Sequence, residues 1–167
     1  MRPVCAIARE TNSLPPLDCL FSCSRGCAEA AVDGPRVIIA GSRSIDRYDL
    51  VQHAMAVLLM HFGQGPFVQV VSGGARGVDR MGERWARENG LPVKVFAVSP
   101  AEWQAMPRTA GHVRNGRMAE YGTHLAAIWD GRSGGTRNMI QQVRAKGRAV
   151  LVSNGATGLY EFYPAAC

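Results

Sequence analysis

The segment FVQVVSGGARGVD, residues 67–79, joins an apolar run to a glycine-rich turn that leads into a second apolar pattern. Its first five residues are nearly all apolar, which is typical of a short strand buried on both faces. The glycines that follow suit a tight strand-to-helix turn, and Val78, Met81 and Trp85 recur at the spacing of one helix face. The segment therefore predicts one strand–turn–helix unit of an α/β fold.

The same alternation continues on both sides of this segment. Further apolar runs lie at residues 37–40, 93–98, 125–129 and 149–152, and a shorter stretch at 159–163 predicts one additional short strand. Because strands that alternate with crossover segments pair in parallel, we expect an α/β fold. Its predicted architecture is a three-layer open parallel sheet of about five strands with helices on both faces.

The segments between the runs are long enough for crossover helices. Asp46 is expected to cap the first helix, and Trp103 is expected in a loop. The apolar face of the first helix is predicted to carry Leu50, Ala54, Val57, Leu58 and Met60, and that of the last helix Met139, Ile140 and Val143.

The chain has 167 residues, of which 47% are apolar, and this is enough for one domain with a real core. Residues 1–34 show no sustained periodicity and end at the turn signal Asp33-Gly34-Pro35. We therefore expect an N-terminal appendage at 1–34 and a folded domain at 35–167. Neither a membrane span nor a signal peptide is apparent, so we expect a soluble cytoplasmic protein with no membrane partner.

Cysteines lie only near the two ends of the chain, at Cys5, Cys19, Cys23, Cys27 and Cys167. An odd number with none in the central part argues against a disulfide scaffold. The spacing of Cys19, Cys23 and Cys27 would place three thiols on one helix face, but it matches no established ligand pattern. We therefore predict no metal site.

Basic residues outnumber acidic ones by 19 to 13, which gives a net charge of +6. Lys94 and Lys146 are the only lysines, so 17 of the 19 basic residues are arginines. Because the guanidinium group makes planar bidentate contacts with phosphate and carboxylate, this composition favours an anionic partner. A coding bias towards arginine would produce the same composition.

Small and polar residues follow three of the predicted strands, at residues 41–43, 72–79 and 130–136. In an open parallel sheet, ligands bind beyond the carboxyl ends of the strands, where backbone N–H groups and helix N-termini hold phosphate. A further cluster at residues 110–120 would place Arg114, Arg117 and Met118 on one helix face. The predicted ligand-binding residues are Gly41, Ser42, Arg43, Ser72, Gly73, Gly74, Arg76, Gly77, Asp79, Arg114, Asn115, Asp130, Gly131, Ser133, Gly134, Gly135 and Thr136.

Simpler interpretations of these residues stay open. Glycine serves tight turns without any ligand, Asp79 suits the start of a helix because it complements the macrodipole, and Arg43, Arg76 and Arg132 could be solvated loop charges. No turn has the Walker pattern or the full dinucleotide fingerprint. We therefore expect no cofactor, no ATP hydrolysis and no ordinary NAD chemistry.

Taken in order, these motifs resemble the SLOG superfamily of Rossmann-like domains, and most closely its YspA-like branch of unassigned function. The matching residues are 41–43, 72–79, the pairs 110–111 and 114–115 with Met118, residues 129–131, Ser133, and the pair 135–136. The resemblance covers residues 36–152. It implies binding or sensing of a nucleotide or nucleotide-derived ligand, in some members within phage–host conflict systems.

The sequence is also similar to the LOG phosphoribohydrolases, which cleave the N-glycosidic bond of nucleoside 5′-monophosphates. Arg114 and Met118 match one LOG motif and Gly135-Thr136 another, but the position of the LOG glutamate holds Met139. Methionine cannot transfer a proton, so an activity of this kind would need Arg114 with Glu120 or Asp130 as catalytic residues. Whether the chain is an enzyme stays open.

A third alternative follows from the turn at residues 72–79, which resembles that of DprA, a protein that binds single-stranded DNA. The net charge of +6 fits this alternative because phosphate neutralisation dominates nonspecific affinity for nucleic acid. However, the aromatic residues do not alternate with basic ones as a stacking platform requires. Nucleic acid is therefore a less favoured partner than a small nucleotide, and the sequence leaves open whether the chain forms a homodimer.

Overall fold

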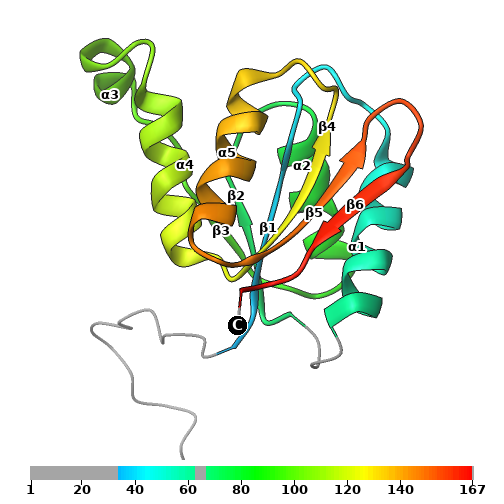
Figure 1. The fold of residues 1–167 in the computed structure, drawn as a ribbon. Helices are drawn as coiled ribbons and strands as arrows, with labels where there is room; N and C mark the ends of the chain where they lie inside the picture. Colours follow the sequence, from blue (N-terminus) through cyan, green and yellow to red (C-terminus); the bar gives the residue numbers. More distant parts are fainter. Residues whose placement is uncertain (1–33, 63–66, 167) are drawn as a thin grey trace, which may run out of the picture. The chain divides into compact units, whose positions relative to one another are not determined.

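The computed structural model of the chain describes residues 34–62 and 67–166, which contain a single six-stranded sheet (Figure 1). Residues 1–33, which are all but the last residue of the predicted appendage, lie outside the described residues. All five cysteines also lie outside them. The strands are β1 (Arg36–Gly41), β2 (Gln69–Ser72), β3 (Val93–Val95), β4 (His124–Trp129), β5 (Ala149–Asn154) and β6 (Tyr160–Tyr163). The helices are α1 (Tyr48–Phe62), α2 (Val78–Glu88), α3 (Pro100–Ala105), α4 (Ala110–Tyr121) and α5 (Gly134–Ala145).

The strand order is β3-β2-β1-β4-β5-β6, and the first five strands in this order are parallel. The stretch at 159–163 forms the additional strand, β6, which pairs antiparallel with β5. The predicted α/β fold is confirmed. The chain leaves β1 first towards β2 and β3 and later returns beside β1 as β4, so the direction of winding reverses between β1 and β4. Ligand sites of open parallel sheets lie at such a reversal.

Helices cover both faces of the sheet, and the side chains of β1 alternate between two cores. Val37 and Ile39 pack with residues of α1 and α2, whereas Ile38 and Ala40 pack with residues of α4 and α5. Figure 1 shows the same division, with α1 and α2 behind the sheet and α4 and α5 in front of it. The continuous apolar runs are thus explained by burial on both faces.

Most of the predicted helix faces are buried, including Val78, Met81 and Trp85 on α2 and Met139, Ile140 and Val143 on α5. On α1 the prediction is wrong for one residue, because Met60 is 83% exposed near the end of the helix. Among the described residues, no helix is both long and apolar enough to cross a membrane.

Three local predictions also need correction. The strand predicted at 93–98 is only Val93–Val95, and it is not buried on both faces because it lies at the sheet edge. Trp103 lies on α3, not in a loop, because Ser99 and Glu102 form a capping box at its start. Helix α1 begins at Tyr48, two residues after Asp46, the residue predicted as its cap.

Candidate functional site

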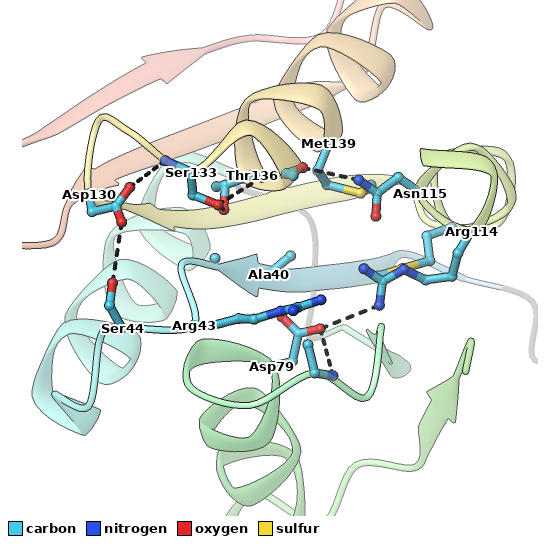
Figure 2. A pocket seen from close by; sticks show the side chains of 14 residues that line it. Ala40, Arg43, Ser44, Asp79, Arg114, Asn115, Asp130, Ser133, Thr136 and Met139 are labelled. Atoms are coloured by element: carbon cyan, nitrogen blue, oxygen red, sulfur yellow. Dashed lines mark hydrogen bonds and ion pairs between the residues drawn. The ribbon is translucent and has the colours of Figure 1, made fainter. Parts of the chain in front are cut away.

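A cavity of about 460 Å³ lies at the carboxyl ends of β1 and β4, where the direction of winding reverses (Figure 2). The loops after β1, β2 and β4 line it, together with residues of α2, α4 and α5. Its lining residues are Ala40, Gly41, Arg43, Ser44, Ala75, Asp79, Arg114, Asn115, Met118, Asp130, Ser133, Gly135, Thr136 and Met139. Nine of these are among the predicted ligand-binding residues.

The loops after β1 and β4 are held together by hydrogen bonds through Ser42 and Asp130. The backbone N–H of Ser42 donates to the carbonyl oxygen of Ile128 (3.0 Å), and the backbone N–H of Asp130 donates to Oγ of Ser42 (3.1 Å). Oγ of Ser44 also donates to Oδ2 of Asp130 (3.2 Å). Ser42 is fully buried, so it shapes the wall of the cavity from behind and does not line it.

Asp130 organises the turn that leads into α5. Its Oδ1 accepts hydrogen bonds from the backbone N–H groups of Arg132 (2.9 Å) and Ser133 (2.8 Å). These backbone donors, with further help from Ser42 and Ser44, lower the pKa of Asp130 to about 2. An ionised carboxylate whose acceptor positions are largely occupied is a weak proton donor or acceptor, and its contacts are those of a turn residue.

Helix α5 presents its N-terminus to the cavity. Ser133 is the N-cap, and its Oγ accepts from the backbone N–H (3.4 Å) and from Oγ1 (3.1 Å) of Thr136. Among the described residues, the backbone N–H groups of Gly134 and Gly135 have no hydrogen-bond acceptor, and a Cβ at either glycine would meet nothing within 4 Å. This helix end therefore offers two open donors and the positive end of the macrodipole.

Arg114 and Asp79 lie on the opposite wall, where Figure 2 shows them pointing towards each other. Nη1 of Arg114, from α4, donates to the carbonyl oxygen of Gly73 and lies 3.9 Å from Oδ2 of Asp79, from α2. Oδ2 of Asp79 also accepts from the backbone N–H of Ala75 (3.2 Å). Burial is the largest effect on both side chains, and it raises the pKa of Asp79 and lowers that of Arg114.

Arg43 crosses the cavity between these two walls (Figure 2). It is exposed, and it makes no hydrogen bond or ion pair with any residue that the structure describes. Its positive charge is close enough to Arg114 to lower the pKa of that residue further. Two guanidinium groups facing one cavity repel each other, and an anion between them would relieve this repulsion.

Asn115 and two methionines complete the lining. Nδ2 of Asn115 donates to the carbonyl oxygen of Gly135 (3.0 Å) and to Oδ1 of Asn138 (3.1 Å), which ties α4 to the start of α5. Met118 and Met139 are 1% and 2% exposed and form an apolar part of the wall. The cavity thus combines donors and cations with an apolar surface, as ligand sites commonly do.

The glycine-rich turn after β2 mainly supports the cavity from outside. Oγ of Ser72 donates to Oε1 of Glu83 (2.7 Å) and accepts from the backbone N–H of Gly74 (3.0 Å). A Cβ at Gly73 would collide with Nη1 of Arg114 at 2.0 Å, so the absence of a side chain lets Arg114 approach. Gly77 has φ +74° and lies against the backbone of the loop after β1, so the turn requires a glycine at this position.

The structure does not bring every predicted residue to the cavity. Gly131 and Gly134 lie in the loop and helix start beside it, and Arg76 and Gly77 line a neighbouring groove. Glu120, a catalytic candidate, does not line the cavity: it lies near the end of α4, where it pairs with Lys146. Residues 114 and 120 lie six positions apart, so about 9 Å of helix separates Glu120 from Arg114.

Ala40, Ser44 and Ala75 line the cavity but were not predicted to bind the ligand, and Met118 and Met139 were predicted only as residues of helix faces and family motifs. Ser44 comes directly after the predicted loop at 41–43, so extending that loop by one residue would have found it. Within the residues that the structure describes, no group of three His, Cys, Asp or Glu side chains is placed to hold a metal ion.

Comparison with known proteins supports the observed fold and also identifies a family. The family model described as "YspA, cpYpsA-related SLOG family" matches residues 35–105. The Gene 61 protein of Mycobacterium phage D29 is 35% identical over 121 residues, which are 70% of this chain and 94% of the phage protein.

Among solved structures, DNA processing protein A (DprA) from Streptococcus pneumoniae is similar with a TM-score of 0.53 and 20% identity. The match covers 75% of this chain and 53% of the DprA chain, so the chain spans about half the length of that protein. At this level of identity the likeness concerns the Rossmann-like fold alone.

Proposed function

The chain belongs to the YspA, cpYpsA-related SLOG family, and from this premise and the geometry of the cavity we propose that it binds a nucleotide or nucleotide-derived ligand. The observation that carries the proposal is the arrangement of the two walls. Open N–H donors of α5 face Arg43 and Arg114 across one cavity of about 460 Å³. This volume is within the range of about 300–1,000 Å³ that is usual for small-molecule sites.

A phosphate group is the anion that best matches these donors. The backbone N–H groups of Gly134 and Gly135 would donate to its oxygens at the positive end of α5, as helix N-termini do in other phosphate sites. Arg43 would supply a charge-assisted contact from the other side. Because Arg114 is already committed to Gly73 and Asp79, it would act mainly through its charge.

The sugar and base would lie over the remaining wall. Nδ2 of Asn115 is committed to Gly135 and Asn138, so its oxygen is the atom left to accept from a ligand. Met118 and Met139 offer a polarisable apolar surface to a base. Asp130 is less suited to this task than the sequence suggested, because backbone N–H groups and Ser44 already occupy its oxygens.

Binding or sensing is favoured over N-glycosidic cleavage. The only carboxylates in the cavity lining are Asp79, which is buried beside Arg114, and Asp130, which holds the turn. Met139 lines the cavity at the position of the LOG glutamate and cannot act as an acid or base. Single-stranded DNA is favoured less, because no aromatic side chain lines the cavity to stack on bases.

Thermal unfolding with a panel of AMP, ADP-ribose, NAD and cyclic nucleotides tests the proposal. A ligand at 100 times its Kd is expected to stabilise the fold by about 2.7 kcal/mol. Arg43→Ala should weaken this ligand about tenfold without lowering the free protein's stability, because its guanidinium makes no hydrogen bond or ion pair with the described residues and repels Arg114. Arg144→Ala on α5, outside the cavity, is the control.

The proposal is contradicted if the melting temperature stays flat across the panel and no nucleotide co-purifies with the protein. For the enzyme alternative, the assay is release of free base from a nucleoside 5′-monophosphate. We expect no base to be released.

A further inference from the structure

A second concave surface, which we call the α2 groove, lies beside the cavity and has a volume of about 490 Å³. Its lining residues are Arg43, Ile45, Asp46, Arg76, Gly77, Arg80, Met81, Arg84 and Arg87. Five of these nine are arginines, and Asp46 is the one acidic residue among them. Arg43 lines both the groove and the cavity, so the two spaces are neighbours that share a guanidinium.

The charges of the α2 groove are only partly compensated within the described residues. Arg43, Arg76 and Arg80 are exposed and form no hydrogen bond or ion pair there. Arg84 pairs with Glu88 (2.7 Å) and lies over the ring of Tyr48 (4.1 Å). The groove therefore presents several guanidinium groups whose donors are available to an anion.

The position of Arg80 is unfavourable for the free α2 helix. Arg80 is in the first turn of α2, where a positive charge opposes the macrodipole. It also lies four residues before Arg84, and like charges at this spacing repel. Solvated surface charge does not require such an arrangement, whereas a bound anion would compensate for it.

We propose that the α2 groove is a second anion subsite for the ligand of the cavity, and that this ligand is a nucleotide with at least two phosphate groups. This inference rests on the proposed function. One phosphate would lie at the N-terminus of α5, and another would reach the groove past Arg43. A nucleoside polyphosphate and a dinucleotide with a 5′-phosphate share this chemistry.

A small ligand fits the α2 groove better than a nucleic-acid strand. Binding of single strands without sequence preference combines a basic track with aromatic side chains on which bases stack. The linings of the cavity and the groove contain no aromatic residue, and the ring of Tyr48, beside the groove, is covered by Arg84. The arginines can therefore contact phosphates but offer no platform for successive bases.

Calorimetric titration of the full chain with AMP, ATP, the dinucleotide pApA and a dT20 strand tests this inference. The variant is Arg80→Gln/Arg87→Gln, and the control is Arg117→Gln/Arg144→Gln, which removes the same charge from residues that line neither space. Melting temperatures of both free variants confirm that they fold.

We expect ATP or pApA to bind the unmodified protein at least about tenfold more tightly than AMP, as one charged contact would provide. The groove variant should lose the preference for ATP or pApA over AMP, whereas the control variant should keep this preference. The affinity of the groove variant for AMP should stay within twofold of that of the unmodified protein. A preference for ATP would identify a continuous phosphate chain, and a preference for pApA a dinucleotide.

The inference is overturned if AMP, ATP and pApA bind equally, or if the groove variant keeps the preference. It is also overturned if dT20 binds more tightly than both and loses affinity in the groove variant, because the surface would then serve a polymer. AMP binding without any preference would leave the proposed function intact. Absence of binding by all nucleotides would overturn both.

Discussion

Asp79 and Arg114 place opposite charges in a largely buried part of the cavity wall, with side chains that are 5% and 15% exposed. Removing two charges from water is costly, and their mutual attraction offsets this cost only in part. The raised pKa of Asp79 indicates the same imbalance, because burial raises this pKa by more than the charge of Arg114 lowers it. The pair therefore holds Arg114 in position at a cost to stability.

The pH dependence of unfolding tests this balance at Asp79. Because its folded-state pKa lies above the unfolded value, the folded state binds the proton first, and stability rises as the pH falls through that pKa. The unmodified protein should therefore gain stability relative to Asp79→Asn as the pH is lowered from 7 towards 4. Chemical denaturation at a series of pH values measures this difference.

Asp49→Asn provides a control of opposite sign. Arg47 lowers the pKa of Asp49, so the stability that this carboxylate contributes is present above its unfolded pKa and is lost on acidification. The unmodified protein should keep its stability relative to Asp49→Asn down to about pH 4 and lose it only as the pH falls below the ordinary carboxyl pKa of 3.8. A loss relative to Asp79→Asn as well would contradict our interpretation of the buried pair.

At the scale of elements, α3 differs from the other helices because it buries none of its residues. Its stability comes from local contacts: the capping box of Ser99 and Glu102, Pro100 in the first turn, and the ion pair of Glu102 with Arg117 (2.7 Å). A helix without a buried face is expected to open without the rest of the fold.

Substitution of the two N-caps tests this expectation. Ser99→Ala should accelerate amide hydrogen exchange in residues 101–105 and leave the global melting temperature unchanged. Ser133→Ala is the matched control, because it removes the N-cap of α5, which buries Met139, Ile140 and Val143. It should lower global stability by about 1 kcal/mol. If Ser99→Ala and Ser133→Ala lowered global stability by the same amount, α3 would be part of the cooperative unit.

At the scale of the whole molecule, the described residues from β1 onwards form two apolar cores, one on each face of the sheet. We therefore propose that residues 35–167 form the folded domain, and we predict that a chain starting at residue 34, one residue before this domain, has the melting temperature of the full chain. Deletion of residues 159–167 is the control, because it removes β6, whose Phe162 and Tyr163 pack against the two cores. A large loss of stability on removing residues 1–33 would refute the proposed boundary.

Much of the fold could be predicted because its signals are local. Strands buried on both faces need continuous apolar runs, and parallel pairing brings their carboxyl ends to one edge, so the loops after β1, β2 and β4 could be assigned to one site before any geometry was known. Met60 and Val95 were harder to predict, because exposure at a helix end or a sheet edge depends on what packs beside each residue.

Within the candidate site, the sequence determined which residue types gather at the edge, and the tertiary structure decided their tasks. Arg43, Arg76 and Arg114 look alike in sequence, yet Arg43 crosses the cavity, Arg76 lines the groove and Arg114 is half-buried beside Asp79. The physical reason is that charge and glycine content belong to the chain, whereas burial, pairing and pKa depend on neighbours that only folding supplies.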